Sequence, residues 1–165
     1  MRYIYLFSLV LLFSFSFVNA QNKNEKQENE ITNPRFEAKL ADSLGADQYG
    51  MKSYVLVILK TGPKDNELTD PTQRAELFKG HFANINALAE SGKLVLAGPF
   101  STANKLKYRG IFLLNCTTEQ EAKELLSGDP TISAGIFEAE ILPWYGSAAI
   151  GTYLDYHERI YKKEP

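Results

Sequence analysis

The stretch GHFANINALAESGKLVLAGPF, residues 80–100, combines the second half of an amphipathic helix, a glycine that stops it and a short apolar strand. At about 3.6 residues per turn, one face of the helix that begins at Pro71 carries Arg74, Leu77, Phe78, His81, Phe82, Ile85, Leu88 and Ala89. His81 therefore lies within the stripe that we expect to be buried. Gly80 costs a helix interior roughly 1 kcal/mol relative to alanine. We therefore expect another segment to approach the backbone closely beside His81.

Strands and helices alternate on either side of this stretch in a recognisable order. Residues 54–60, 93–97, 108–115 and 136–142 have the apolar, β-branched composition of strands. One helix follows Asp70-Pro71, and a second opens with the capping box Thr118 to Glu121. The order β-α-β-β-α-β predicts an α+β, ferredoxin-like fold, in which a four-stranded antiparallel sheet carries both helices on one face.

The other face of this sheet needs a cover. Residues 54–60 and 111–114 are apolar on both sides of the strand, whereas a solvated sheet face alternates apolar with polar residues. A second copy of the chain, packed sheet against sheet, is the simplest cover. We therefore expect a homodimer through the sheet face.

The N-terminus predicts export. Arg2 precedes an apolar run from Ile4 to Val18, and Val18-Asn19-Ala20 places small or apolar residues at the cleavage positions, as in a secretory signal peptide cleaved before Gln21. The alternative is an uncleaved membrane anchor, but the run is shorter than the ~20 residues that a spanning helix needs. We expect a periplasmic or secreted protein with no membrane association after cleavage. The expected organisation is a signal peptide at 1–20, a flexible linker at 21–33, an accessory helical segment at 34–52, a ferredoxin-like domain at 53–145 and a C-terminal tail at 146–165.

Composition excludes several classes of function. The formal net charge is −2 at pH 7, and the lysines and arginines do not cluster, which argues against nucleic acid as a partner. One cysteine, Cys116, and two distant histidines cannot build an ordinary structural zinc site. The sequence has no phosphate-binding loop and no dinucleotide fingerprint. We therefore expect neither a metal nor a cofactor.

His81 and Asp129 are the candidates for chemistry. Asp129 follows the second predicted helix, and both helices lie on one face of the sheet, so the two side chains could meet. A carboxylate that accepts from one imidazole nitrogen leaves the other nitrogen as a base. The alternative for His81 is a satisfied core histidine, and for Asp129 a turn begun by Asp-Pro. Arg109, Asn84 and Trp144 are weaker candidates for substrate binding.

The ordered set of motifs resembles the YCII-related (YciI-like) family. The matching segments are 54–59, 81–85, 92–99, 109–112, 128–130 and 134–136, within a span from Tyr54 to Trp144. The resemblance implies a dimeric α+β barrel and an active-site His-Asp pair at His81 and Asp129. One branch of the family eliminates hydrogen chloride from chlorinated hydroquinones. The signal peptide, the 33–50 extension and the tail depart from compact members.

Two functions are consistent with this reading. The first is a cofactor-free lyase or isomerase, in which His81 abstracts a proton from a small cyclic or aromatic substrate. Asp129 would orient the imidazole, and Arg109 would steady the developing negative charge. The second is a non-catalytic dimeric module that binds a small molecule in the same pocket. The sequence does not separate the two.

Overall fold

The computed structural model describes residues 33–163. The chain divides into two units, residues 1–36 and 37–165, and the account below concerns the second. The expected signal peptide and nearly all of the expected linker lie outside the described residues. None of the helices in the described part is long and apolar enough to cross a membrane.

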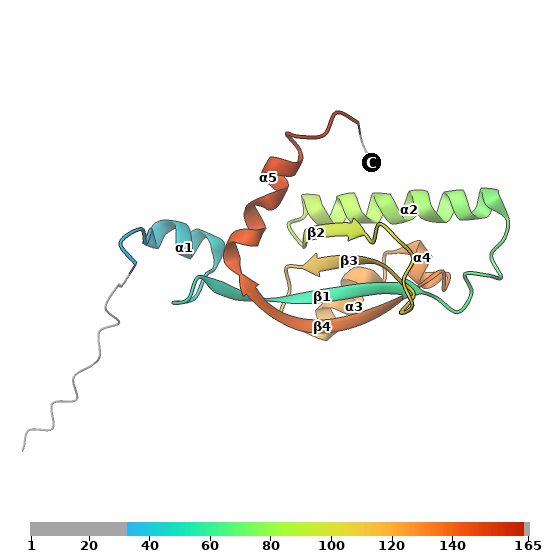
Figure 1. Cartoon of the computed structure of the whole chain (residues 1–165), viewed down its shortest axis with the longest axis horizontal. Coiled ribbons are helices and arrows are strands. Elements are labelled where there is room, and N and C mark those ends of the chain that lie inside the picture. Colours follow the sequence, from blue (N-terminus) through green and yellow to red (C-terminus); the bar gives the residue numbers. More distant parts are fainter. Residues whose placement is uncertain (1–32, 164–165) are drawn as a thin grey trace, which may run out of the picture. The chain divides into compact units, whose positions relative to one another are not determined.

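The second unit contains a four-stranded sheet, helices on one of its faces, and a helical C-terminal segment (Figure 1). In chain order the elements are α1 (Ala38–Leu44), β1 (Met51–Thr61), α2 (Pro71–Glu90), β2 (Leu94–Pro99), β3 (Tyr108–Leu114), α3 (Glu119–Leu126), α4 (Pro130–Ser133), β4 (Phe137–Ser147), the 3-10 helix η1 (Ala148–Thr152) and α5 (Tyr153–His157). The strands lie in the order β2-β3-β1-β4, and all neighbours are antiparallel. The ferredoxin-like α+β fold is thereby confirmed.

Local sequence signals explain where the two long helices begin. The Asp70 carboxylate accepts from the backbone N–H groups of Thr72 and Gln73, and Pro71 occupies the first turn of α2. The Thr118 side chain accepts from the Glu121 N–H at the start of α3. Just beyond α2, Gly92 has a φ of 70°, a left-handed conformation that stops the helix at little cost.

The main core lies between the helices and one face of the sheet. Alternate β1 residues Val55, Val57 and Leu59 pack there with side chains from β3, α2 and α3. Both long helices therefore cover the same face, as expected. Phe82, which we placed on the buried stripe of α2, is instead half exposed, because the apolar face of the helix is narrower than the spacing predicted.

The opposite face, which we call the open face, is covered only in part. Tyr54, Val95 and Leu113 are buried there, and Ile150 of η1 packs against them. The C-terminal segment is thus a partial cover of this face. Leu142 and Trp144 remain 38% exposed on this face.

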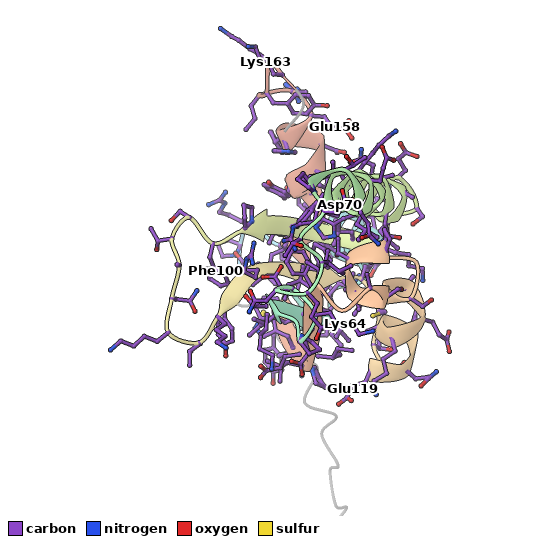
Figure 2. The ribbon with its side chains drawn as sticks, turned by 90° about the vertical axis from the view of Figure 1, so that its right-hand side faces the viewer. Lys64, Asp70, Phe100, Glu119, Glu158 and Lys163 are labelled. Carbon is purple, nitrogen blue, oxygen red and sulfur yellow. The ribbon has the colours of Figure 1, made fainter. Side chains whose placement is uncertain are left out.

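Two element boundaries differ from the sequence expectations, and one helix is additional. The helix α1 begins at Ala38 and not at Pro34, because residues 34 and 35 form a turn. The strand β4 runs to Ser147 and pairs with β1 along its whole length, so the expected tail at 146–165 begins inside the sheet. The helix α4 was not predicted. Figure 2 shows the loop next to Phe100, between β2 and β3, projecting away from the helices.

Candidate functional site

His81 lies in the middle of α2 and points toward the sheet. His81 is only 6% exposed, and aromatic side chains from three elements enclose its ring. The ring centroids lie 5.4 to 6.1 Å from those of Phe78, Phe82, Phe112 and Phe137. Phe112 stacks on the imidazole with an interplanar angle of 29°, and the other three approach edge-on. Aromatic packing therefore restricts the orientation of the imidazole.

Asp129 meets this imidazole from the connection between α3 and α4. His81 Nδ1 lies 2.6 Å from Asp129 Oδ2, and the carboxylate is 0% exposed. The other oxygen, Oδ1, accepts from the backbone N–H of Thr131 at 2.9 Å and from its hydroxyl at 2.6 Å. Every described contact of the carboxylate therefore goes to His81 or Thr131.

Asp129 owes its position to α4. We expected it to follow a helix C-terminus, where the dipole disfavours a carboxylate. It does follow the end of α3, where its backbone N–H donates to the Leu126 carbonyl, but it is also the N-cap of α4, where the backbone N–H groups favour negative charge. The close approach expected at Gly80 is also present, because a Cβ there would lie 2.6 Å from Pro130 Cγ. The contact between Gly80 and Pro130 seats α4 against α2 and thereby brings Asp129 to His81.

The electrostatics of the pair favour an ionised Asp129. Burial opposes ionisation, but hydrogen bonds from His81 and Thr131 and the charge of His81 outweigh it, so the pKa of the Asp129 carboxyl is lowered. With Nδ1–H donated to this carboxylate, the lone pair of the neutral ring lies on Nε2. Nε2 makes no hydrogen bond within residues 33–163, so its lone pair is free to take a proton.

A β-bulge brings Arg109 to the end of the sheet at which Phe137 lies. Leu59 pairs with Gly110 but Lys60 pairs with Tyr108, so Arg109 is the extra residue of β3. The bulge turns Arg109 toward the helix side, where its guanidinium lies 5.5 Å from the ring centroid of Phe137. Arg109 Nη1 also lies 3.8 Å from Asp65 Oδ2, and its side chain is 41% exposed.

A family comparison bears directly on these residues. The model of the YCII-related domain matches residues 54–145, more than half of the chain, including His81, Arg109 and Asp129. The chain belongs to the YCII-related domain family. Comparison with curated proteins gave no match. Among solved structures, the chain is similar to 5-chloro-2-hydroxyhydroquinone dehydrochlorinase (TftG) from Burkholderia phenoliruptrix AC1100, in complex with 2,5-dihydroxybenzoquinone. The two are 20% identical with a TM-score of 0.42, and the match covers 55% of this chain and 92% of that chain.

Of the two remaining candidates for substrate binding in this YCII-related domain, Asn84 lies beside the site and Trp144 lies away from it. Asn84 faces the α3–α4 connection, and a Cβ on Gly128 would lie 2.9 Å from its Oδ1. Trp144 pairs with Tyr54 across the strands and packs beside it on the open face, with ring centroids 5.9 Å apart at a tilt of 40°. It lies seven residues along β4 from Phe137, roughly 23 Å at the rise of an extended strand. The structure therefore does not bring Trp144 to His81.

Other residues of the site were missed at the level of sequence. Thr131 fixes the Asp129 carboxylate, and Phe137 lies between His81 and Arg109. A signal for Thr131 was present, because Asp129-Pro130-Thr131 repeats the helix-starting triplet Asp70-Pro71-Thr72. Phe137 carried no signal beyond its apolar character. Within the described residues, no group of three or more histidine, cysteine, aspartate or glutamate side chains could hold a metal ion.

Proposed function

We propose that this YCII-related protein is a cofactor-free lyase or isomerase in which His81 and Asp129 transfer a proton. The observation that carries the proposal is the buried contact of 2.6 Å between His81 Nδ1 and Asp129 Oδ2. A buried carboxylate bonded to one imidazole nitrogen is the arrangement that general bases use, because it holds one tautomer and stabilises the imidazolium.

The side chains around the pair suggest the substrate and the steps. His81 Nε2 takes a proton from the substrate, and the resulting imidazolium lies against the Asp129 carboxylate. Arg109 supplies a positive charge near the place where negative charge develops on the substrate. The phenylalanines around His81 favour a flat, apolar body. The substrate class that this lining supports is a small cyclic or aromatic compound with an acidic proton.

A non-catalytic binding module is the alternative. The enclosure of His81 by four phenylalanine rings and its exposure of only 6% are also what a core histidine satisfied by one carboxylate shows, and such a histidine takes no proton from a ligand. In that case the pocket would bind a small molecule without turnover. The two functions differ in whether Nε2 exchanges a proton with a bound molecule.

The assembly and the location belong to the same proposal. A homodimer through the open face would cover the exposed part of Leu142 and Trp144. Export to the periplasm or the exterior is supported by the signal-like residues 1–20. Mass spectrometry of protein recovered from a bacterial host tests export, and we expect a new N-terminus at Gln21.

Proton exchange tests the proposed reaction. Cyclic compounds with acidic C–H groups are incubated with the protein in D₂O, and mass spectrometry follows deuterium uptake at carbon. We expect uptake with the wild type and loss of about a hundredfold or more in His81→Gln. The matched control is His157→Gln, because the other histidine lies on α5 between Tyr153 and Tyr161. Equal uptake by His81→Gln and the wild type would remove His81 as the base.

A further inference from the structure

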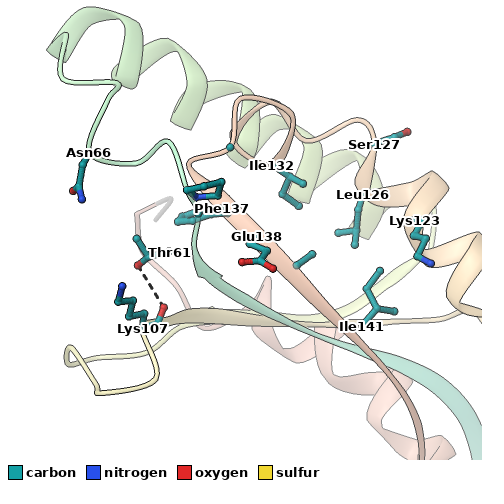
Figure 3. A pocket seen from close by; sticks show the side chains of 14 residues that line it. Thr61, Asn66, Lys107, Lys123, Leu126, Ser127, Ile132, Phe137, Glu138 and Ile141 are labelled. Carbon is teal, nitrogen blue, oxygen red and sulfur yellow. Dashed lines mark hydrogen bonds between the residues drawn. The ribbon is translucent and has the colours of Figure 1, made fainter.

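A large hollow lies next to the His81 site but does not include it. It has a volume of about 780 Å³ and lies alongside β4, between the loops at one end of the sheet and the helices α3 and α4. Figure 3 shows Lys107 and Asn66 at one end of the hollow and Lys123 and Ser127 at the other. Neither His81 nor Asp129 lines it. Its size is that of a small-molecule pocket.

One aromatic ring separates the hollow from the imidazole. Phe137 lines the hollow, and its ring centroid lies 5.4 Å from that of His81 in an edge-on contact. The Phe137 ring centroid also lies 5.7 Å from that of Phe78, and the Arg109 guanidinium lies over the Phe137 ring at 5.5 Å from its centroid. A molecule in the hollow would therefore have the Phe137 ring between itself and His81.

The hollow has an unneutralised cation at one end. Lys107 has a φ of 58°, a left-handed conformation that lysine adopts only at a cost and that is frequent at ligand sites. The conformation is held because the Lys107 carbonyl accepts from the Thr61 N–H at 2.9 Å, while the Lys107 N–H donates to Asn104. Within residues 33–163, no carboxylate forms an ion pair with Lys107.

The remaining charges of the hollow are paired, and its walls are apolar. Lys123 lies 4.0 Å from Glu119, and Glu138 lies 4.0 Å from Lys60. The apolar part of the lining is formed by Leu126, Ile132, Phe137, Ala139 and Ile141. The chemistry that complements one free ammonium beside an apolar wall is a small organic anion with an apolar body.

We propose that the hollow is the substrate chamber of the His81 site and that it takes a small amphipathic organic anion. Lys107 holds the anionic group, the apolar wall receives the body, and the Phe137 ring must turn aside before the substrate reaches Nε2. The inference deepens the proposed function and rests on it for the chemical step. The binding of the anion is independent of that step.

Calorimetric titration of the full chain with 1-naphthoate tests the chamber, with uncharged 1-naphthalenemethanol as the matched ligand. We expect 1-naphthoate to bind more tightly than the alcohol. Lys107→Ala should weaken its binding by up to about fivefold, the upper end of the range of an exposed ion pair. Lys105→Ala, in the same loop but outside the lining, should leave the binding unchanged. Equal binding by Lys107→Ala and the wild type would overturn the proposal.

Ser127→Trp tests the chamber in a second way, by filling it. Ser127 is exposed and lines the hollow, so the indole occupies the hollow without disturbing the core. We expect it to abolish 1-naphthoate binding and deuterium uptake together. Asn66→Trp, from the opposite end, serves the same purpose should Ser127→Trp fail to fold. Undiminished uptake by a filled variant would overturn the chamber and leave the His81 chemistry standing. Binding as predicted in a wild type without uptake would instead refute the proposed reaction alone.

Discussion

Replacing Asp129 tests how the pair is held together. Asp129→Ala removes the N-cap of α4, worth about 1 kcal/mol, and the charged hydrogen bond to His81, worth about 1.5–3 kcal/mol. It also leaves the buried Thr131 hydroxyl and His81 Nδ1 without their acceptor. We therefore expect the free energy of unfolding to fall by about 3–5 kcal/mol, as for one partner lost from a buried ion pair.

Asp129→Asn is the matched variant. An asparagine keeps an oxygen for the Thr131 N–H but turns an amide donor toward His81 Nδ1, so the charge is lost and the imidazole must change tautomer. We expect it to cost about 1–2 kcal/mol, at the lower end of what a charged partner contributes. Urea denaturation of the full-length protein at pH 7 measures both variants. If the two variants are equally stable, the capping and hydrogen-bonding roles assigned to Asp129 are wrong.

The same pair predicts a dependence on pH. Hydrogen bonds from His81 and Thr131 outweigh burial and lower the pKa of the Asp129 carboxyl below its usual value of 3.8. A lowered pKa in the folded state means that the carboxylate stabilises the fold above pH 3.8, and this contribution is lost as the pH falls through the folded pKa. The advantage of the wild type over Asp129→Asn should therefore be smaller at pH 3 than at pH 5. An equal advantage at both values would contradict the lowered pKa.

Three further outcomes follow from packing. Gly80→Ala should lower the free energy of unfolding by about 1–2 kcal/mol, because its Cβ would lie 2.6 Å from Pro130 Cγ and overpacking outweighs the gain in helix propensity. The control is Gly98→Ala, whose Cβ would have no atom within 4 Å. Thermal melts compare the two variants. Asp70→Ala should cost about 1 kcal/mol in a urea titration, and Asp70→Ser should restore most of it. Leu142→Glu should convert the expected dimer into a monomer in light scattering, and a wild type that is already monomeric would remove the dimer proposal.

Much of the fold was predictable from local signals. Asp70-Pro71 and Gly92 bracket α2 because capping and a left-handed glycine act through neighbouring residues only. The strand order follows from the sequence of elements and from the handedness of crossovers. The contact between His81 and Asp129 was also predicted, since both helices had to lie on one face of the sheet.

The features that the sequence did not reveal depend on contacts between distant segments. The bulge that turns Arg109 toward Phe137 is a property of the pairing between β1 and β3. Trp144 lies on the open face because β4 continues in register past Leu142, and no local signal ends the strand where we had expected. The helix α4 was missed because Asp-Pro begins turns as well as helices.

The tautomer of His81 tests the central claim most directly. Nitrogen-15 spectra of the full-length protein, recorded where the imidazole is neutral, report which ring nitrogen carries the proton. We predict a proton on Nδ1 in the wild type, donated to Asp129, and a free lone pair on Nε2. In Asp129→Asn the amide can donate to Nδ1, so we predict the proton on Nε2. A wild-type ring protonated at Nε2 would contradict the assignment of His81 as a base held by Asp129.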